Sequence, residues 1–187
     1  MSAPTLEPTS RSAVKEGAGT ARKIVIMGVS GCGKSTVGEL LAESEGAVFL
    51  DGDSLHPKSN IDKMAAGHPL NDQDREPWLR EIGQRLGSPG QGSMIIACSA
   101  LKRSYRDLIR AEAPGTLFVH LHGAPELLAE RMGARPGHFM PVGLLESQLA
   151  TLEPLGSDEA AVVLDIAANP ESLTGQASAW LAGLPAA

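Results

Sequence analysis

Residues 28–35 read Gly-Val-Ser-Gly-Cys-Gly-Lys-Ser and match the pattern GxxxxGK(S/T) at every fixed position. An apolar run, 23–27, precedes them, and an amphipathic pattern begins at Ser35. Glycine lets backbone N–H groups turn inward around phosphate oxygens, and the N-terminus of a following helix adds its partial positive charge. The sequence therefore predicts a phosphate-binding loop (P-loop) between a strand and a helix.

Two side chains of this loop have expected chemical roles. Lys34 should reach the β- and γ-phosphates of a nucleotide, and the Ser35 hydroxyl should be a ligand of Mg²⁺. The chain contains no NKxD-type sequence of the kind that selects guanine, which favours ATP. The predicted nucleotide contacts in this stretch are Gly28, Val29, Ser30, Gly31, Cys32, Gly33, Lys34, Ser35 and Thr36.

The rest of the chain alternates between strand and helix patterns. Nearly continuous apolar runs, typical of strands buried on both faces of a parallel sheet, occur at 23–27, 47–50, 94–98, 116–121 and 161–164. Residues at helical spacing lie between them, and Asn169-Pro170-Glu171 predicts the start of a last helix that runs to about residue 184. We expect a doubly wound α/β fold of the P-loop NTPase type, with a parallel five-stranded sheet and helices on both faces.

The chain is long enough for one domain, which we place at residues 21–187. Residues 1–20 are rich in Ser, Ala, Pro, Thr and Gly and lack the apolar segment of a secretory signal, so we expect a disordered extension. Long irregular segments in a compact domain are usually functional. On this basis we predict a substrate-binding region at 51–90 and a lid at 131–141, at the ligand-binding edge of the sheet.

The composition excludes several classes of protein. No apolar run is long enough to span a bilayer, so no membrane partner is expected. The net charge of −6 argues against a nucleic-acid partner. The two cysteines, Cys32 and Cys98, belong to no CxxC pair or Cys/His cluster. Neither a disulfide framework nor a zinc site is therefore predicted, and a reducing, cytoplasmic location is expected.

More specific motifs follow the second and third predicted strands. Residues 49–57 read Phe-Leu-Asp-Gly-Asp-Ser-Leu-His-Pro, residues 98–107 read Cys-Ser-Ala-Leu-Lys-Arg-Ser-Tyr-Arg-Asp, and residues 135–140 read Arg-Pro-Gly-His-Phe-Met. In this order, the set resembles the thermoresistant-type bacterial gluconokinase family of P-loop small-molecule kinases. The resemblance implies that ATP and D-gluconate, with Mg²⁺, give ADP and 6-phospho-D-gluconate, and it suggests a homodimer.

Phosphoryl transfer depends mainly on positioning and on neutralising charge. Asp51 and Asp53 lie two residues apart at one strand end, and the resemblance implies that one of them serves the metal and the other binds the attacking hydroxyl. We assign Asp51 to the metal site and Asp53 to the hydroxyl. The resemblance also places Arg131, Arg135 and His138 in a lid that closes over ATP, where Arg131 contacts the nucleotide. The predicted catalytic set is Lys34, Asp53, Arg131 and Arg135, and the predicted metal ligands are Ser35 and Asp51.

A sugar acid requires cations at its carboxylate and hydrogen-bonding groups along its hydroxyls. Arginine matches a carboxylate with two parallel hydrogen bonds. Lys102 and Arg106 are four residues apart, so on a helix they would share a face. The predicted substrate contacts are Asp53, His56, Arg75, Lys102, Tyr105, Arg106 and His138.

Two other functions remain open at this point. A shikimate kinase or another polyol kinase would share the architecture, although shikimate kinase is expected to have a glycine-rich turn where this chain has residues 98–102. A regulator that binds ATP without transferring phosphate is the second alternative. The presence of both Asp51 and Asp53 beside an intact P-loop argues against it.

Overall fold

The computed structural model describes residues 21–134 and 142–185. Five parallel strands form one sheet in the order β2-β3-β1-β4-β5, which confirms the predicted fold class. The strands are β1 (Lys23–Met27), β2 (Val48–Asp51), β3 (Met94–Ala97), β4 (Leu117–His122) and β5 (Ala161–Asp165). Each lies within one residue of its predicted position.

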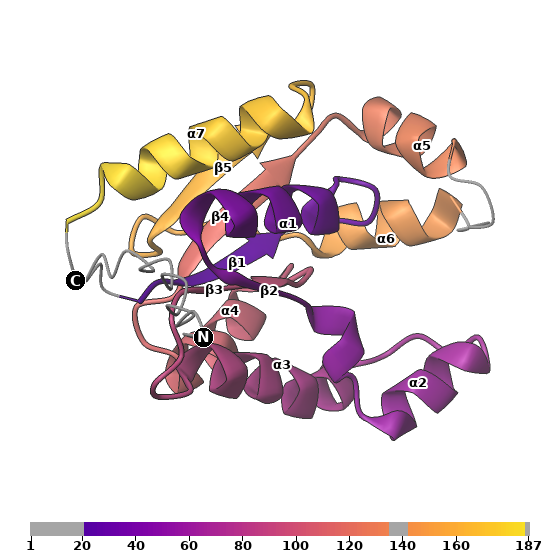
Figure 1. The fold of residues 1–187 in the computed structure, drawn as a ribbon. Helices are drawn as coiled ribbons and strands as arrows, with labels where there is room; N and C mark the ends of the chain where they lie inside the picture. The colour runs from indigo at the N-terminus through magenta and orange to yellow at the C-terminus, as the bar shows by residue number, and fades with distance from the viewer. Residues whose placement is uncertain (1–20, 135–141, 186–187) are drawn as a thin grey trace, which may run out of the picture.

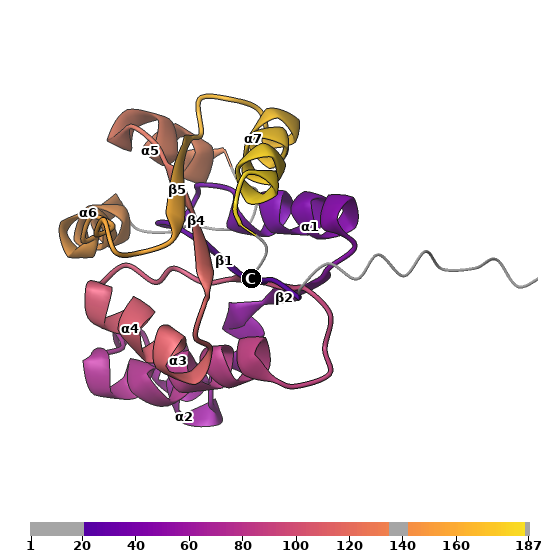
Figure 2. The same ribbon diagram turned by 90° about the vertical axis from the view of Figure 1, so that its left-hand side faces the viewer.

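Seven α-helices and one 3-10 helix connect these strands within the described residues. They are α1 (Lys34–Glu45), the 3-10 helix η1 (Gly52–Leu55), α2 (Lys58–Ala65), α3 (Asp72–Gly87), α4 (Arg103–Glu112), α5 (Pro125–Gly133), α6 (Val142–Thr151) and α7 (Pro170–Ala182). Helices α1 and α7 cover one face of the sheet, and α3 and α4 cover the other (Figures 1 and 2). Among the described residues, no helix is both long and apolar enough to cross a membrane.

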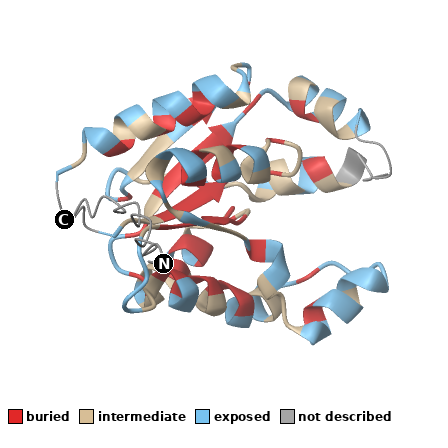
Figure 3. Cartoon of the chain, in the orientation of Figure 1, coloured by how far each residue is buried: buried red, intermediate tan, exposed pale blue. Residues whose placement is uncertain are grey.

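Burial on both faces explains the continuous apolar strands. In β1, Ile24 and Ile26 belong to the core beneath α1 and α7, whereas Val25 and Met27 belong to the core beneath α3 and α4. All four side chains are fully buried, and Figure 3 shows the buried strands between the two layers of helices. Side chains of a strand alternate between faces, so two cores require apolar residues at consecutive positions.

Helices α2 and α6 and the helix η1 were not predicted. The segment after β2 is polar, as expected, but it folds into η1 and α2. Helix α6 follows residues 135–141, which belong to the predicted lid and lie outside the described residues. The predicted extension at residues 1–20 also lies outside them.

Candidate active site

The P-loop leaves the carboxyl end of β1 and leads directly into α1. Gly31 and Gly33 have φ angles of 82° and 92°, a region that glycine adopts without strain. Gly33 is the N-cap of α1 and has no side chain that could occupy the first N–H groups of the helix. These donors can therefore serve an anion. The Lys34 Nζ atom donates a hydrogen bond to the Val29 carbonyl oxygen at 3.1 Å.

The two predicted metal ligands lie next to each other, Asp51 at the end of β2 and Ser35 in the first turn of α1. The Ser35 Oγ atom donates to Asp51 Oδ2 at 3.1 Å, and Asp51 Oδ1 accepts from the Asp53 backbone N–H at 3.0 Å. Both are hard oxygen ligands on one side of the P-loop. Such a pair fits Mg²⁺, which usually takes one or two protein oxygens and completes its shell with water and substrate phosphate.

Gly52 fixes the turn between the two aspartates. A Cβ atom at this position would lie 2.5 Å from the Ala97 carbonyl oxygen, so the close contact with β3 requires glycine. The Trp78 indole N–H donates to the Gly52 carbonyl at 2.7 Å and holds the turn against α3. As a result, Asp53 stands at the edge of the sheet with a side chain that is 85% exposed.

His56 packs inside this turn. Its ring stacks on Trp78 with a centroid distance of 4.1 Å, and its Nδ1 atom lies 3.3 Å from the Asn60 amide nitrogen. The His56 Nε2 atom is 4.0 Å from an Asp53 carboxylate oxygen. Burial lowers the pKa of His56 below its usual value. The contacts support the turn that carries Asp53. Neither His56 nor Asp53 lines the cavity described next.

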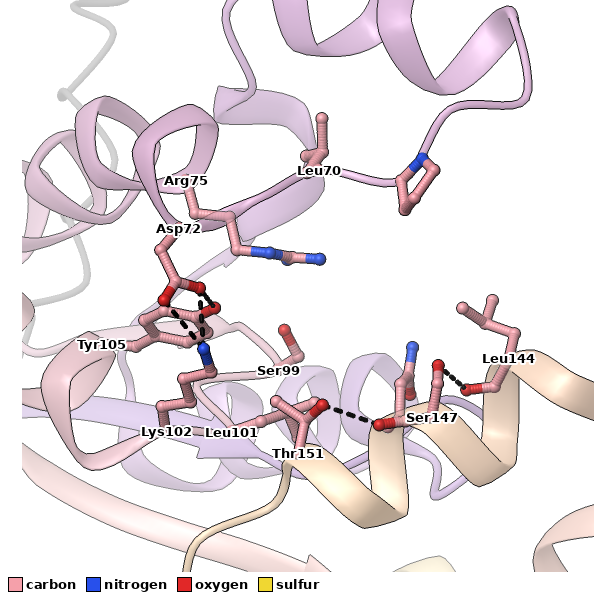
Figure 4. A pocket seen from close by; sticks show the side chains of 12 residues that line it. Leu70, Asp72, Arg75, Ser99, Leu101, Lys102, Tyr105, Leu144, Ser147 and Thr151 are labelled. Atoms are coloured by element: carbon pink, nitrogen blue, oxygen red, sulfur yellow. Dashed lines mark hydrogen bonds and ion pairs between the residues drawn. The ribbon is translucent and has the colours of Figure 1, made fainter.

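A cavity of about 230 Å³ opens beside the P-loop (Figure 4). One wall comes from α3 and the residues before it, the opposite wall comes from α6, and the floor comes from the segment after β3. The lining residues are Pro69, Leu70, Asp72, Arg75, Ser99, Leu101, Lys102, Tyr105, Leu144, Ser147, Gln148 and Thr151.

Three of the predicted substrate residues line this cavity: Arg75, Lys102 and Tyr105. Two of them bind a residue that was not predicted, Asp72. Lys102 Nζ donates to both carboxylate oxygens of Asp72 at 2.8 Å, and the Tyr105 hydroxyl donates to Asp72 Oδ1 at 2.5 Å. The hydrogen bond from Lys102 is the main reason that the pKa of Asp72 is lowered, and the same bond raises the pKa of Lys102. Burial, together with Asp72, raises the pKa of Tyr105.

Arg75 has different surroundings from Lys102. Its guanidinium group points into the cavity in Figure 4, and its central carbon lies 6.0 Å from the centre of the Tyr105 ring. Within residues 21–134 and 142–185, no carboxylate forms an ion pair with it. Its donors can therefore serve a ligand.

The structure corrects the prediction for Arg106. This side chain is fully buried, away from the cavity, and its guanidinium group forms two hydrogen bonds with the Glu159 carboxylate, at 2.7 and 3.0 Å. It also donates to four backbone carbonyls: those of Ala100, Leu101, Glu153 and Pro154. These internal acceptors use the donor capacity of the group. Arg106 therefore has a structural role and is not available to a substrate carboxylate.

Helix α5 brings Arg131 close to the P-loop. A Cβ atom at Gly31 would lie 2.7 Å from Met132 Cγ, which shows how tightly the last turn of α5 packs on the loop. The Arg131 guanidinium donates to the Ile166 carbonyl at 2.7 Å. Arg135 and His138, the other residues of the predicted lid cluster, lie outside the described residues.

Several cavity residues were not predicted from the sequence. Asp72 received no role from the sequence, although its carboxylate accepts hydrogen bonds from both Lys102 and Tyr105. Gln148 belongs to α6, and its Oε1 and Nε2 atoms contact the backbone N–H and the hydroxyl of Ser30 at 2.7 and 3.1 Å. The spacing of Leu145, Leu149 and Leu152 by four and then three residues is a helical signal that could have revealed α6.

Comparisons with known proteins agree with this arrangement. Residues 24–140 match a protein-family model described as an AAA domain. A probable gluconokinase of Xenopus tropicalis is 48% identical over 161 residues, which cover 76% of this chain and 84% of that protein. The thermoresistant gluconokinase of Escherichia coli K12 is 46% identical over 145 residues, which cover 76% of this chain and 83% of that protein.

Solved structures give the same result. The crystal structure of a gluconokinase from Sinorhizobium meliloti 1021 superposes with a TM-score of 0.79 at 52% identity, covering 86% of this chain and 91% of that one. A shikimate kinase from Aquifex aeolicus shares the fold alone, with a TM-score of 0.53 at 18% identity over 86% of this chain and 96% of that one. The chain belongs to the P-loop family that the AAA-domain model describes and, within it, to the gluconokinase family.

Proposed function

We propose that this protein transfers the γ-phosphate of ATP to the terminal primary hydroxyl of D-gluconate. The hydroxyl oxygen forms a bond to the γ-phosphorus, the bond from that phosphorus to the β,γ-bridging oxygen breaks, and the hydroxyl proton is released. The products are ADP and 6-phospho-D-gluconate. Relatives of this chain named as gluconokinases support the assignment.

The observation that carries the proposal is that one residue of the cavity wall, Gln148, also binds the P-loop. Gln148 lines the cavity and hydrogen-bonds to Ser30 of the loop. A hydroxylated ligand in the cavity would therefore lie beside phosphates held by the loop, which is the positioning that transfer requires. Arg75 would bind the carboxylate of that ligand, and the hydroxyl groups of Ser99, Ser147 and Thr151 offer partners for its hydroxyls.

The residues at the end of β2 have complementary roles in this proposal. Asp51 and Ser35 would hold Mg²⁺, which supplies positive charge to the β- and γ-phosphate oxygens. Asp53 would accept a hydrogen bond from the attacking hydroxyl and orient it. Lys34 would hold negative charge on the β- and γ-phosphates, and Arg131, from α5, would offset charge on the transferring group.

Comparison of acceptors tests the proposal. We expect kcat/KM for gluconate to exceed that for glucose by about 10⁴, because glucose would leave the Arg75 charge without its partner. Shikimate and glycerol should also be poor acceptors. The measurement is coupled ADP release for the four compounds, with mass spectrometry of the product.

Each contrary outcome has a distinct meaning. Equal values for gluconate and glucose would contradict the role of Arg75 as carboxylate anchor. Preference for shikimate would move the protein to the alternative acceptor class. Tight binding of ATP with no transfer to any acceptor would identify a nucleotide-binding regulator.

A further inference from the structure

Gln148 forms a two-point contact with the P-loop. Its Oε1 atom accepts the Ser30 backbone N–H at 2.7 Å, and its Nε2 atom donates to the Ser30 hydroxyl at 3.1 Å. The side-chain amide of Gln148 is thus matched to both polar groups of one loop residue, 118 positions earlier in the chain. Neither group of Ser30 needs this partner for the fold of the loop itself, because glycines already permit the turn.

The peptide unit that Gln148 holds is the one that also receives Lys34. The Ser30 N–H and the Val29 carbonyl belong to the same planar peptide group, and the Val29 oxygen accepts the Lys34 ammonium at 3.1 Å. Because a peptide group is planar, fixing the direction of its N–H fixes the direction of its carbonyl. Gln148 and Lys34 therefore hold opposite ends of one rigid unit.

Helix α6 is a firm support for this contact. Leu145, one turn before Gln148, is buried in the core beneath α1 and α7. Just beyond the helix, the Glu153 backbone N–H donates to the Leu101 carbonyl at 2.8 Å, and the Glu153 carboxylate accepts the Arg103 backbone N–H at 2.6 Å. The Gln148 backbone is therefore held by packing in this core and by hydrogen bonds just beyond the helix, in addition to its own contact with the P-loop.

We propose that Gln148 is a positioning residue that acts through the Val29–Ser30 peptide to orient Lys34 for phosphate binding. The inference rests on the proposed kinase function, since Lys34 is taken to bind the β- and γ-phosphates. Gln148 also forms part of the wall of the acceptor cavity. The Gln148 side chain therefore connects the cavity wall, through the Val29–Ser30 peptide, to Lys34, which is proposed to bind the phosphates.

Gln148→Leu removes both hydrogen bonds and keeps a side chain of similar size. We expect the Ser30 amide to exchange about fivefold faster with solvent in the nucleotide-free protein, because the one hydrogen bond that it loses is worth on the order of 1 kcal/mol. ATP should bind about five- to thirtyfold more weakly, because up to two such bonds are lost. Gln176→Leu is the matched control, because Gln176 is exposed on α7 and contacts only the Ser172 hydroxyl among described groups. Amide exchange of Val25 in the core of β1 should not change in either variant.

ATP binding measured without gluconate distinguishes two roles of Gln148: positioning Lys34, as proposed, or only lining the cavity that holds the acceptor. If Gln148→Leu raises KM for gluconate while the affinity for ATP and the exchange of the Ser30 amide stay at wild-type values, the proposal is overturned. A double-mutant cycle with Lys34→Ala gives a second test. In the Lys34→Ala background, Gln148→Leu should weaken ATP binding no further, whereas an undiminished effect would show that Gln148 does not act through Lys34.

The binding and exchange measurements do not depend on the acceptor. Failure of the wild-type protein to phosphorylate gluconate would contradict the proposed function and leave these results intact. Wild-type activity toward gluconate with no effect of Gln148→Leu on nucleotide binding would contradict only the positioning role.

Discussion

Arg75 and Lys102 line the same cavity, but their charges have different partners. Lys102 is bound by both oxygens of Asp72, whereas Arg75 has no carboxylate partner in the described part of the chain. A substrate carboxylate therefore gains most from Arg75, because it need not displace an existing ion pair. The sequence spacing could not show which of these two cations pairs with a carboxylate, because it does not reveal that Asp72 lies beside Lys102.

Arg75→Ala should raise KM for gluconate about 10- to 100-fold, the range expected for the loss of a charge-assisted hydrogen bond. The affinity for ATP should change little, because Arg75 lies in the acceptor cavity. Steady-state kinetics and nucleotide titration measure the two effects. Arg85→Ala is the matched control on the same helix, where Arg85 pairs with Glu81 on the surface. An equal loss in both variants would contradict the anchoring role of Arg75.

Asp53→Asn should lower kcat by at least about 100-fold and leave ATP affinity close to wild type. The variant retains one acceptor oxygen but loses the charge that orients the hydroxyl. Asp51, not Asp53, is hydrogen-bonded to Ser35, the other predicted metal ligand. Titration with Mg²⁺ and ATP measures nucleotide binding, and single-turnover kinetics measures transfer. Together they test whether Asp51 serves the metal and Asp53 the hydroxyl. Loss of Mg²⁺-dependent ATP binding with gluconate binding unchanged would reverse the two aspartate roles.

At the scale of elements, α4 carries two kinds of cationic side chain. Arg106 faces inward and pairs with Glu159, and both side chains are fully buried. Arg103 lies one turn earlier and pairs with Asp158 at the surface. The predicted shared face of Lys102 and Arg106 failed because Lys102 is the N-cap of α4. A residue with extended backbone geometry does not follow the helical spacing on which that prediction depended.

Arg106→Ala should lower the free energy of unfolding by about 3–5 kcal/mol, because it removes both hydrogen bonds from arginine to the buried Glu159 carboxylate and leaves only longer ion pairs with Arg103 and Arg110, at 3.8 and 3.7 Å. Urea unfolding measures the loss. The folded fraction of Arg106→Ala should keep a KM for gluconate near wild type, since Arg106 does not line the cavity. Arg103→Ala removes exposed ion pairs with Asp107 and Asp158 and only a longer contact with Glu159, at 3.8 Å, so it should cost much less stability. A stable Arg106→Ala protein with weak gluconate binding would restore the original prediction.

The same ion pair predicts a pH dependence of stability. Burial raises the pKa of Glu159, but hydrogen bonds from Arg106 and the Gly156 N–H outweigh it and bring the pKa below its usual value of 4.5. The stability contributed by this charge is therefore complete above the usual value and is lost as pH falls through the lower folded value. The difference in unfolding free energy between wild type and Glu159→Gln should shrink as pH falls below 4.5. A constant difference would contradict the ionised state of Glu159.

At the scale of the whole molecule, the sequence predicted the sheet and the P-loop well. Consecutive apolar residues such as Ile24 and Val25 are required wherever a strand is covered on both faces, so the pattern is strong. The acceptor cavity was harder to predict, because its walls come from α3, the segment after β3 and α6. Contacts such as the one between Gln148 and Ser30 join residues far apart in the sequence. Patterns of neighbouring residues therefore cannot predict them.

Removal of residues 1–20 should leave both the melting temperature and kcat/KM near wild-type values. Their composition offers too little apolar surface to offset the entropy of ordering them. Within the described part of the chain, Arg22 is the first residue hydrogen-bonded at the sheet: its carbonyl accepts the Met94 N–H at 2.8 Å, and its N–H donates to the Ser93 hydroxyl at 3.0 Å. Thermal unfolding and coupled kinetics test the truncation.

A longer truncation, of residues 1–24, provides the control for this prediction. It removes Lys23 and Ile24 from β1, the central strand of the sheet, and Ile24 is fully buried. Loss of such a side chain costs about 2–5 kcal/mol in typical cores, so this protein should unfold at a much lower temperature. If both truncations were equally harmful, the domain boundary at residue 21 would be wrong, and residues 1–20 would contribute to the stability of the fold.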